Sequence, residues 1–199
     1  MEGHSSPQLF TALHGMGLRY KTLEDGERQV VNFIFPGDFI GMQAAILGEM
    51  KHSVEATTAM TLCVFDRKEI WQLYKTEPER GFSLTWLAAI EEHFLGEALA
   101  TVGQRSAKER VAWALLRIHR RLSSLNLNHA KSVPLPYRQR DIADAVGLSL
   151  VHTNKTLAAL REQQLASWVG SHLIIADDAK LAQVAGLDPE SETPRRPLM

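Results

Sequence analysis

The first third of the chain shows the short alternating and β-branched segments that are typical of strands. Residues 18–22 and 30–35 form two such segments, and Asp25-Gly26 lies in the turn between them. Asp-Gly between two extended arms is a strong hairpin signal, because both residues tolerate a positive φ. Residues 39–41 and 53–65 add short extended pieces that lack helical periodicity. This pattern predicts a small β-roll or barrel.

After Pro78 the chain carries no proline or turn cluster until about residue 102, and apolar residues recur every three or four positions. This spacing predicts one long helix with a continuous apolar stripe. Phe82, Trp86 and Leu95 make the stripe broader than a small roll needs, which favours a dimerisation helix over residues 79–102. A helix that only packs on its own β domain is the alternative. The stripe consists of Leu84, Leu87, Ile90, Phe94, Ala98 and Val102.

The second half begins with a predicted helix over residues 107–122. Ser106 and Glu109 form a capping-box pattern at its start, in which Ser accepts from the backbone and Glu reaches back. Gly103, just before it, is expected to end the long helix. Residues 123–136 indicate a polar loop and then an extended connector, since each residue before a proline avoids the α region.

Two short helices joined by a glycine turn come next. They fit residues 138–146 and 150–163, with Gly147 as a left-handed C-cap and Ser149 as the N-cap of the second helix. This arrangement is the signature of a helix-turn-helix. A short hairpin over residues 165–175 follows, which makes the domain a winged helix.

These elements predict an α+β chain. A β-roll leads into a long dimerisation helix, and a winged helix-turn-helix follows. The predicted domains are a β-roll of the sensory type over residues 1–77, the dimerisation helix over 78–103, the winged helix-turn-helix with a closing helix over 104–187, and a tail over 188–199.

The second helix of the predicted motif has one face that suits the major groove of DNA. On a helical count Thr153, Thr156, Leu157 and Leu160 face inward, which leaves Val151, Asn154, Lys155 and Ala158 outward. Asn can make two hydrogen bonds to adenine, and Lys can reach guanine acceptors or a phosphate. A generic solvated face would more often carry Glu and Lys pairs, but this face holds no carboxylate until the end of the helix.

A set of exposed polar and basic positions is therefore predicted to contact DNA. The wing residues Ser171 and His172 are placed to touch the phosphate backbone, although turn residues of these types are more often simply exposed. The predicted DNA-binding residues are Arg138, Arg140, Ser149, Val151, His152, Asn154, Lys155, Ser171 and His172.

The overall charge at first argues against a nucleic-acid partner. The 199 residues carry 22 Lys and Arg against 23 Asp and Glu, a formal net charge of −1, whereas a duplex binder needs a basic surface to displace counterions. The charge is unevenly distributed, because residues 1–104 sum to −6, residues 105–176 to +7 and residues 177–199 to −2. The basic half is therefore the nucleic-acid candidate. The bias is strongest over residues 105–140, which hold 9 Lys and Arg against the single acid Glu109.

No catalytic or metal-binding pattern stands out. The chain has no nucleophile elbow, phosphate-binding glycine loop or zinc-protease motif. Its first half holds His4, His14, His52 and His93 far apart in sequence, so a β-roll metalloenzyme is the least supported alternative. The single Cys63 does not suffice for an iron–sulfur cluster, and its apolar neighbours predict a buried structural thiol.

No apolar run reaches the about 18 residues of a membrane span, and the N-terminal segment lacks the pattern of a secretory signal. We therefore expect a cytoplasmic protein with no membrane partner.

The order of elements and several motifs together resemble the CRP/FNR superfamily of bacterial transcription regulators. The matching stretches include Pro36-Gly37-Asp38-Phe39-Ile40-Gly41 and residues 141–157, and the resemblance spans about residues 10–187. It implies a cyclic-nucleotide-binding-like β-roll and a homodimer that binds a palindromic operator in double-stranded DNA, each recognition helix entering one half-site. RNA polymerase is a further partner that the resemblance suggests.

The sequence departs from the family at the effector site. Members that bind cyclic nucleotides carry Gly-Glu-Leu and, about ten residues later, an Arg that neutralises the cyclic phosphate. This chain has Gly41-Met42-Gln43 and then Lys51-His52-Ser53. Lys51 could still attract an anion, but the carboxylate and the guanidinium fork are absent, so cyclic AMP is not expected as effector. The family's oxygen sensors use four cysteines for an iron–sulfur cluster, which is not expected here either, and the effector stays unassigned.

The family's β-roll usually begins well before the hairpin that starts here at Gly17. Either the natural start lies upstream, or the chain has shed the first strands of its roll. An incomplete roll would expose a strand edge and part of its apolar interior, and would lack an enclosed effector pocket.

The recognition helix also departs from its relatives. Many of them carry Glu and Arg where this sequence has Val151 and Lys155, so the operator is expected to differ from the family's best-known half-sites. Two functions stay open beside the metalloenzyme. One is a DNA-binding homodimeric regulator, and the other is a truncated member that pairs with a full-length regulator and modulates it.

Overall fold

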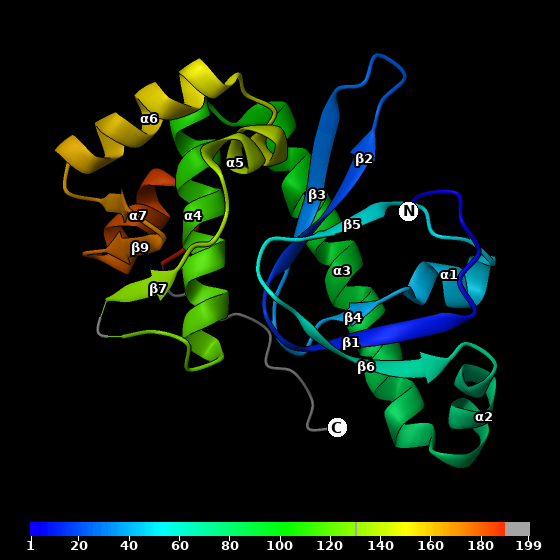
Figure 1. Ribbon diagram of the computed structural model, residues 1–199. Helices are drawn as coiled ribbons and strands as arrows, with labels where there is room; N and C mark the ends of the chain where they lie inside the picture. The colour runs from blue at the N-terminus through cyan, green and yellow to red at the C-terminus, as the bar shows by residue number, and fades with distance from the viewer. Residues whose placement is uncertain (130, 190–199) are drawn as a thin grey trace. The chain divides into compact units, whose positions relative to one another are not determined.

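The computed structural model describes residues 1–129 and 131–189 (Figure 1). The predicted α+β fold is confirmed, since antiparallel strands precede a long helix and a helix-turn-helix unit. Of the predicted tail, residues 190–199 lie outside the described residues.

The chain divides into two compact units. The first comprises Met1–Lys21 and Val31–Gly96. The second comprises Thr22–Val30, which is the tip of the predicted hairpin, together with the described residues between 97 and 189. The hairpin tip therefore belongs to the same unit as the helix-turn-helix.

The elements before residue 77 form the β-roll and two short helices. They are β1 (Gln8–His14), β2 (Gly17–Thr22), β3 (Arg28–Ile34), β4 (Phe39–Ile40), α1 (Met42–Leu47), β5 (Ser53–Ala56), β6 (Thr61–Asp66) and α2 (Glu69–Thr76). In one antiparallel sheet β1 pairs with β4 and β6, so that Phe10 lies opposite both Ile40 and Val64. In the other sheet the order is β3-β2-β5, and Leu18 lies opposite Glu55.

Strand alternation sends one set of side chains into the core of the roll, since successive residues of a strand point to opposite faces. Residues from β1, β3, β4 and α1 meet there, which ties the two sheets together. The buried cluster consists of Ala12, Ile34, Ile40, Ala44 and Met50, with Phe10, Val54 and Met60 packed against it.

The sequence pattern does not predict β1, α1 or α2. Helix α1 is too short to show a helical period, and it lies between Gly41 and Gly48, which both have a positive φ. Helix α2 has apolar residues at 70, 71, 73 and 74, but its eight residues are too few for periodicity to distinguish a helix from a strand.

Strand β6 is poorly covered by the described residues. Its registered partner is β1, and Leu62, Val64 and Phe65 are each exposed by more than a third of their surface. The prediction of a buried Cys63 is wrong, because Cys63 is only half-buried in β6.

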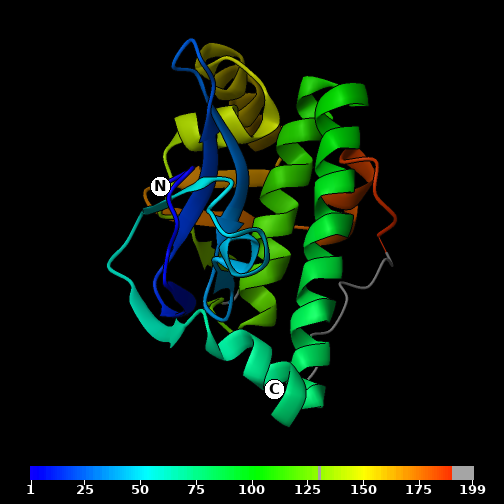
Figure 2. The same ribbon diagram turned by 90° about the vertical axis from the view of Figure 1, so that its right-hand side faces the viewer.

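The elements after residue 77 are α3 (Pro78–Gln104), α4 (Ala107–Ser124), β7 (Ser132–Pro134), α5 (Gln139–Val146), α6 (Leu150–Glu162), β8 (Ala166–Val169), β9 (His172–Ile175) and α7 (Asp178–Val184). Helix α3 is one unbroken helix in both views (Figures 1 and 2).

The boundary between α3 and α4 corrects one prediction and confirms another. Gly103 does not end α3, because the helical hydrogen bonds continue past it and Arg105 N–H still donates to Thr101 O. The capping box is confirmed, since Ser106 Oγ accepts from Glu109 N–H and Glu109 Oε2 accepts from Ser106 N–H at 2.6 Å.

Helix α4 is the central element of the second unit, and α5, α6 and α7 all pack against it. Its apolar face follows the helical period and is largely removed from water, which is the main favourable term in holding the smaller helices. The buried residues of α4 are Val111, Ala112, Trp113, Ala114, Leu115, Leu116, Ile118 and Leu122.

His52 is a buried titratable group in the β-roll. Its ring is 8% exposed, Nδ1 lies 3.0 Å from Gln43 Oε1, and Nε2 has no hydrogen-bond partner among the described residues. Burial, and secondarily the charge of Arg19, lower the pKa of His52 to about 4. The ring is therefore neutral at physiological pH.

This neutral histidine predicts a loss of stability in acid. The pKa of His52 is about 6.5 in the unfolded chain and lower in the folded one, so its contribution is complete above about pH 6.5 and is lost as the pH falls towards 4. The urea midpoint of the wild type should therefore fall more between about pH 7 and pH 5 than that of His52→Asn. The exposed His14 provides the control His14→Asn, which should follow the wild type, and equal pH dependence in all three proteins would contradict the assignment.

Candidate nucleic-acid interface

The turn between α5 and α6 depends on a glycine. Gly147 has a φ of +65°, and a Cβ built on it would lie 3.2 Å from Val102 Cγ1. Its left-handed conformation ends α5, and Leu148 N–H then donates to Ala143 O at 3.1 Å. The predicted C-cap is confirmed, and it lets α6 begin two residues later.

Helix α6 begins as predicted and buries its predicted inner face. Ser149 Oγ accepts from His152 N–H at 3.2 Å, which satisfies one free donor of the first turn. Thr153, Thr156 and Leu160 are buried, whereas Leu157, also expected inside, is half-buried.

The opposite face of α6 is open to solvent. Val151 is 66% exposed, and His152, Asn154 and Lys155 are also exposed. Leu150 at the first position of the helix is 43% exposed and joins this face. Sequence reasoning missed Leu150, because a leucine at a helix start gives no sign of which way it points.

The two arginines predicted at the start of α5 are exposed side chains on an ordered backbone. Arg138 is the N-cap, and its N–H donates to Asp141 Oδ2 at 2.7 Å. Arg140 Nε lies 4.0 Å from Asp144 Oδ1, at the outer limit of an ion pair. The structure thus orders the backbone at Arg138 and leaves both side chains exposed at the start of α5.

The predicted wing is a three-stranded sheet of order β7-β9-β8. Ser171 and His172 lie exposed at the turn between β8 and β9, and Trp168 Nε1 donates to Gly170 O at 3.0 Å. All nine residues that the sequence predicts for DNA contact are therefore solvent-exposed side chains of one compact unit.

The structure shows that part of the basic charge of this unit is used internally. Arg120 pairs with Asp178 at 2.7 Å, Arg110 Nε donates to Arg105 O, and Arg117 lies over the ring of Trp113 at 5.4 Å. The charge count over residues 105–140 therefore overstates the charge available to a ligand. The basic side chains that remain near the motif are those of α5 and α6.

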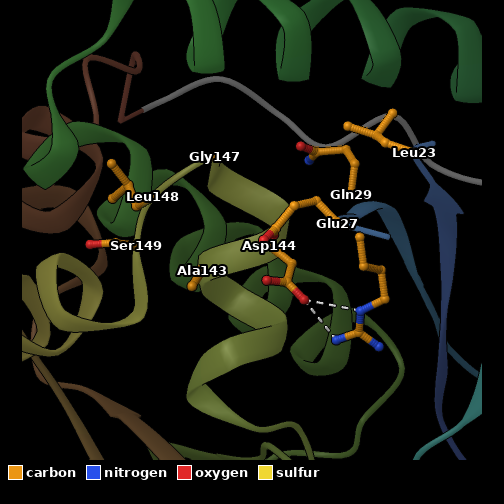
Figure 3. Close-up of a pocket in the computed structure, with 9 residues that line it drawn as sticks. Leu23, Glu27, Gln29, Ala143, Asp144, Gly147, Leu148 and Ser149 are labelled. Carbon is orange, nitrogen blue, oxygen red and sulfur yellow. Dashed lines mark hydrogen bonds and ion pairs between the residues drawn. The ribbon is translucent and has the colours of Figure 1, made fainter. Parts of the chain in front are cut away.

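A cavity of about 320 Å³ lies beside the α5–α6 turn (Figure 3). Its lining residues are Leu23, Glu27, Arg28, Gln29, Ala143, Asp144, Gly147, Leu148 and Ser149. The dashed lines in Figure 3 mark the contacts between Arg28 and Asp144, which span 2.9 and 3.0 Å. The charged groups here already pair with one another, so we assign no cofactor to this cavity.

Lys51, the residue that could still attract an anion, already has a carboxylate partner, and so does Arg19 of β2. Lys51 forms an ion pair with Glu49, and Arg19 donates to Glu91 Oε1 at 2.8 Å. Among residues 1–129 and 131–189 no group of three or more His, Cys, Asp or Glu is arranged to hold a metal. None of the described helices is long and apolar enough to cross a bilayer.

Family models match both parts of the chain. A model of the cyclic nucleotide-binding domain matches residues 1–77, and a model of the Crp-like helix-turn-helix domain matches residues 109–184.

Curated relatives extend over most of the chain. The nitrogen fixation regulation protein FixK of Bradyrhizobium diazoefficiens is 31% identical over 176 residues, which are 88% of this chain and 73% of FixK. The transcriptional activator protein FnrL of Cereibacter sphaeroides is 30% identical over 184 residues, which are 90% of this chain and 73% of FnrL.

Solved structures share the fold. FixK2 from Bradyrhizobium japonicum has a TM-score of 0.81 at 26% identity, covering 92% of this chain and 91% of FixK2. A transcriptional regulator of the CRP family from Thermus thermophilus has a TM-score of 0.74 at 20% identity, covering 96% of this chain and 93% of its own.

The buried hydroxyl of Thr153 leads to a prediction about the inner face of α6. Its Oγ1 has no hydrogen-bond partner among the described residues, and the side chain is fully buried. Thr153→Val keeps the shape and removes an unsatisfied polar atom, so the free energy of unfolding should stay the same or rise. Ser149→Ala removes a cap and should lower it by about 1 kcal/mol. Urea unfolding of both variants is the measurement, and a clear destabilisation by Thr153→Val would show that the hydroxyl has a partner.

Proposed function

Because this chain belongs to the CRP/FNR family of transcription regulators, we propose that it binds a palindromic operator as a homodimer. DNA binding and transcription regulation follow from the family itself. The proposal covers three further points, which are the arrangement of the dimer, the residues that read the operator, and RNA polymerase as a partner. A regulator that acts on DNA and polymerase works in the cytoplasm, which we propose as its location.

One observation carries the proposed mode of binding, namely the exposed, carboxylate-free outer face of α6. Asn154 supplies an amide that can bond adenine in the major groove, and Lys155 supplies a donor for guanine or phosphate. Val151 offers an apolar surface that suits a thymine methyl group. We assign these three residues to base reading.

The remaining predicted residues are assigned to the phosphate backbone. Arg138 and Arg140 carry positive charge at the start of α5, and Ser171 and His172 present hydrogen-bonding groups at the tip of the wing. Ser149 and His152 lie in the first turn of α6, where free N–H groups and the helix dipole favour an anion. Such contacts fix orientation and register but carry little sequence information.

We propose that helix α3 forms the dimer interface through a second apolar row. The predicted stripe packs against its own chain, since Leu84 and Phe94 are buried. Leu95 and Leu99, one helical turn apart at the edge of this stripe, are 43% and 76% exposed, and Phe82, on another side of α3, is 68% exposed. Large apolar side chains in this number on one helix favour contact with another helix. The domain boundaries at 77/78, 103/104 and 187/188 belong to the same proposal.

Selection of bound sites from random duplexes tests the proposal. We expect enrichment of palindromes whose half-sites lie about one helical turn apart, and an affinity that falls steeply with salt. Enrichment of single half-sites would exclude the symmetric dimer. Binding that requires an added full-length CRP/FNR regulator would instead support the modulator alternative.

Replacement of Lys155 tests the reading face. Lys155→Ala should weaken binding to the selected duplex by about 5- to 10-fold and relax the preference at one base pair per half-site. Lys180→Ala is the matched control, because Lys180 is an exposed lysine of α7 that pairs with Asp177. Fluorescence anisotropy on the selected duplex and its single-base variants gives both results. An unchanged affinity and footprint would remove Lys155 from the interface.

Replacement of Leu99 tests the dimer. Leu99→Glu places a charge in the exposed row of α3, and we expect it to convert the dimer into a monomer, because burying an unpaired carboxylate is unfavourable. Leu47→Glu is the control, since Leu47 is 62% exposed on α1. Sedimentation equilibrium measures the dissociation constant, and a wild-type value for Leu99→Glu would place the interface elsewhere.

A further inference from the structure

The hairpin tip, residues 22–30, contacts the first helix of the helix-turn-helix. Arg28 Nη2 donates to Asp141 Oδ1 at 2.5 Å and lies 2.9 Å from Asp144 Oδ2, which also accepts from Arg28 Nε at 3.0 Å. Gln29 Nε2 donates to Ala145 O at 3.3 Å. The contacts join segments more than 110 residues apart within one compact unit.

This ion pair is well shielded from water. The Arg28 side chain is 20% exposed, and those of Asp141 and Asp144 are 3% and 12% exposed. Burial opposes the charge on Arg28, but the hydrogen bonds and charges of the two carboxylates outweigh it, so the pKa of Arg28 lies above its ordinary value. The cation therefore stays charged and balances two shielded acids, of which Asp144 also has Arg140 at 4.0 Å.

Asp141 connects this contact to the predicted interface. Its Oδ2 accepts from the N–H of Arg138, the N-cap of α5, while its Oδ1 accepts from Arg28. One carboxylate thus fixes both the start of the helix and the position of the hairpin tip. Arg138 is one of the residues assigned to the phosphate backbone.

Asp144 connects the contact to the second helix of the motif. It lines the same cavity as Gly147, Leu148 and Ser149, which form the turn and the N-cap of α6 (Figure 3). The side chains assigned to base reading remain exposed, so the hairpin tip contacts the motif without covering its outer face.

We propose that Arg28 is a positioning residue for DNA binding, which holds α5 and the α5–α6 turn in the arrangement that presents α6 to the operator. This inference rests on the proposed function. Arg28 acts through Asp141 and Asp144 and need not touch DNA. An arginine suits this role because its planar fork reaches two carboxylates at once, whereas a lysine offers one point charge.

The experiment compares Arg28→Ala with Arg120→Ala. Arg120 is the matched control, since its side chain is 19% exposed and donates to Asp178 at 2.9 and 2.7 Å, yet it joins α4 to α7 and not to α5. Arg28→Ala removes ion pairs to two shielded acids, whereas Arg120→Ala removes an ion pair to Asp178, whose side chain is 41% exposed. A loss of DNA affinity that follows the loss of melting temperature in both variants indicates a structural role, and a loss of affinity beyond that in Arg28→Ala alone indicates a positioning role.

We expect Arg28→Ala to bind the selected duplex about tenfold more weakly, and Arg120→Ala to bind within about twofold of the wild type. Arg28→Lys should fall between Arg28→Ala and the wild type. Hydrogen exchange without DNA should show faster exchange of the α5 amides in Arg28→Ala only. Melting temperatures of all variants report any general loss of stability.

Two results would overturn the proposal. One is wild-type affinity in Arg28→Ala, and the other is an equal loss of affinity in both alanine variants. If the wild type itself selects no duplex, the proposed operator binding fails. Hydrogen exchange at α5 then decides separately whether Arg28 holds the helix.

Discussion

Asp141 places a carboxylate in the interior of the second unit, where a charge is tolerated only if its oxygens are hydrogen-bonded and a counter-charge is near. Its two oxygens accept from Arg138 N–H and from Arg28. The start of α5 is therefore set by the same group that draws the hairpin tip to the motif. Gly147 then determines where α5 ends, and Ser149 determines where α6 begins. Asp141, Gly147 and Ser149 therefore determine the spacing and direction of α5 and α6. The orientation of the exposed face of α6 depends on all three residues.

The distribution of charge in the structure refines the argument from composition. A net charge near zero combines an acidic β-roll with a basic second unit, but the basic side chains of that unit are not equivalent. Contacts within the unit involve Arg110, Arg117 and Arg120. These arginines therefore stabilise the unit and add to its positive electrostatic potential, but they are not assigned to direct contacts with phosphate groups. Exposed cations near the motif lie on α5 and α6, and Lys131 and Lys180 are exposed elsewhere in the unit. Because salt dependence follows the number of phosphates neutralised, only the cations that reach phosphate groups set the salt slope.

Features that depend on neighbouring residues could be predicted from the sequence. The capping box at Ser106, the left-handed Gly147 and the cap at Ser149 each involve partners within about four residues, and the outer face of α6 needs only the helical period. Features that depend on residues distant in the sequence could not be predicted. Nothing local identifies Asp141 as the partner of Arg28, and the exposure of Cys63 depends on which strands flank β6. Helix α2 escaped prediction for a different reason, since its eight residues are too few for an argument from periodicity.

In the proposed mode of binding, helix α3 links dimerisation to DNA binding. One side of α3 is covered by its own chain, while Leu95 and Leu99 remain in water, and burial of each large apolar side chain is worth about 1.5–3 kcal/mol. In a two-fold symmetric interface both protomers bury the same residues, so each residue contributes twice to the free energy of association. A short apolar row is therefore enough to stabilise the proposed dimer. The same helix ends at Gln104, two residues before the cap of α4. In the proposed dimer, a two-fold axis along α3 would relate two helix-turn-helix units, and a palindromic operator would select such a symmetric pair of recognition helices.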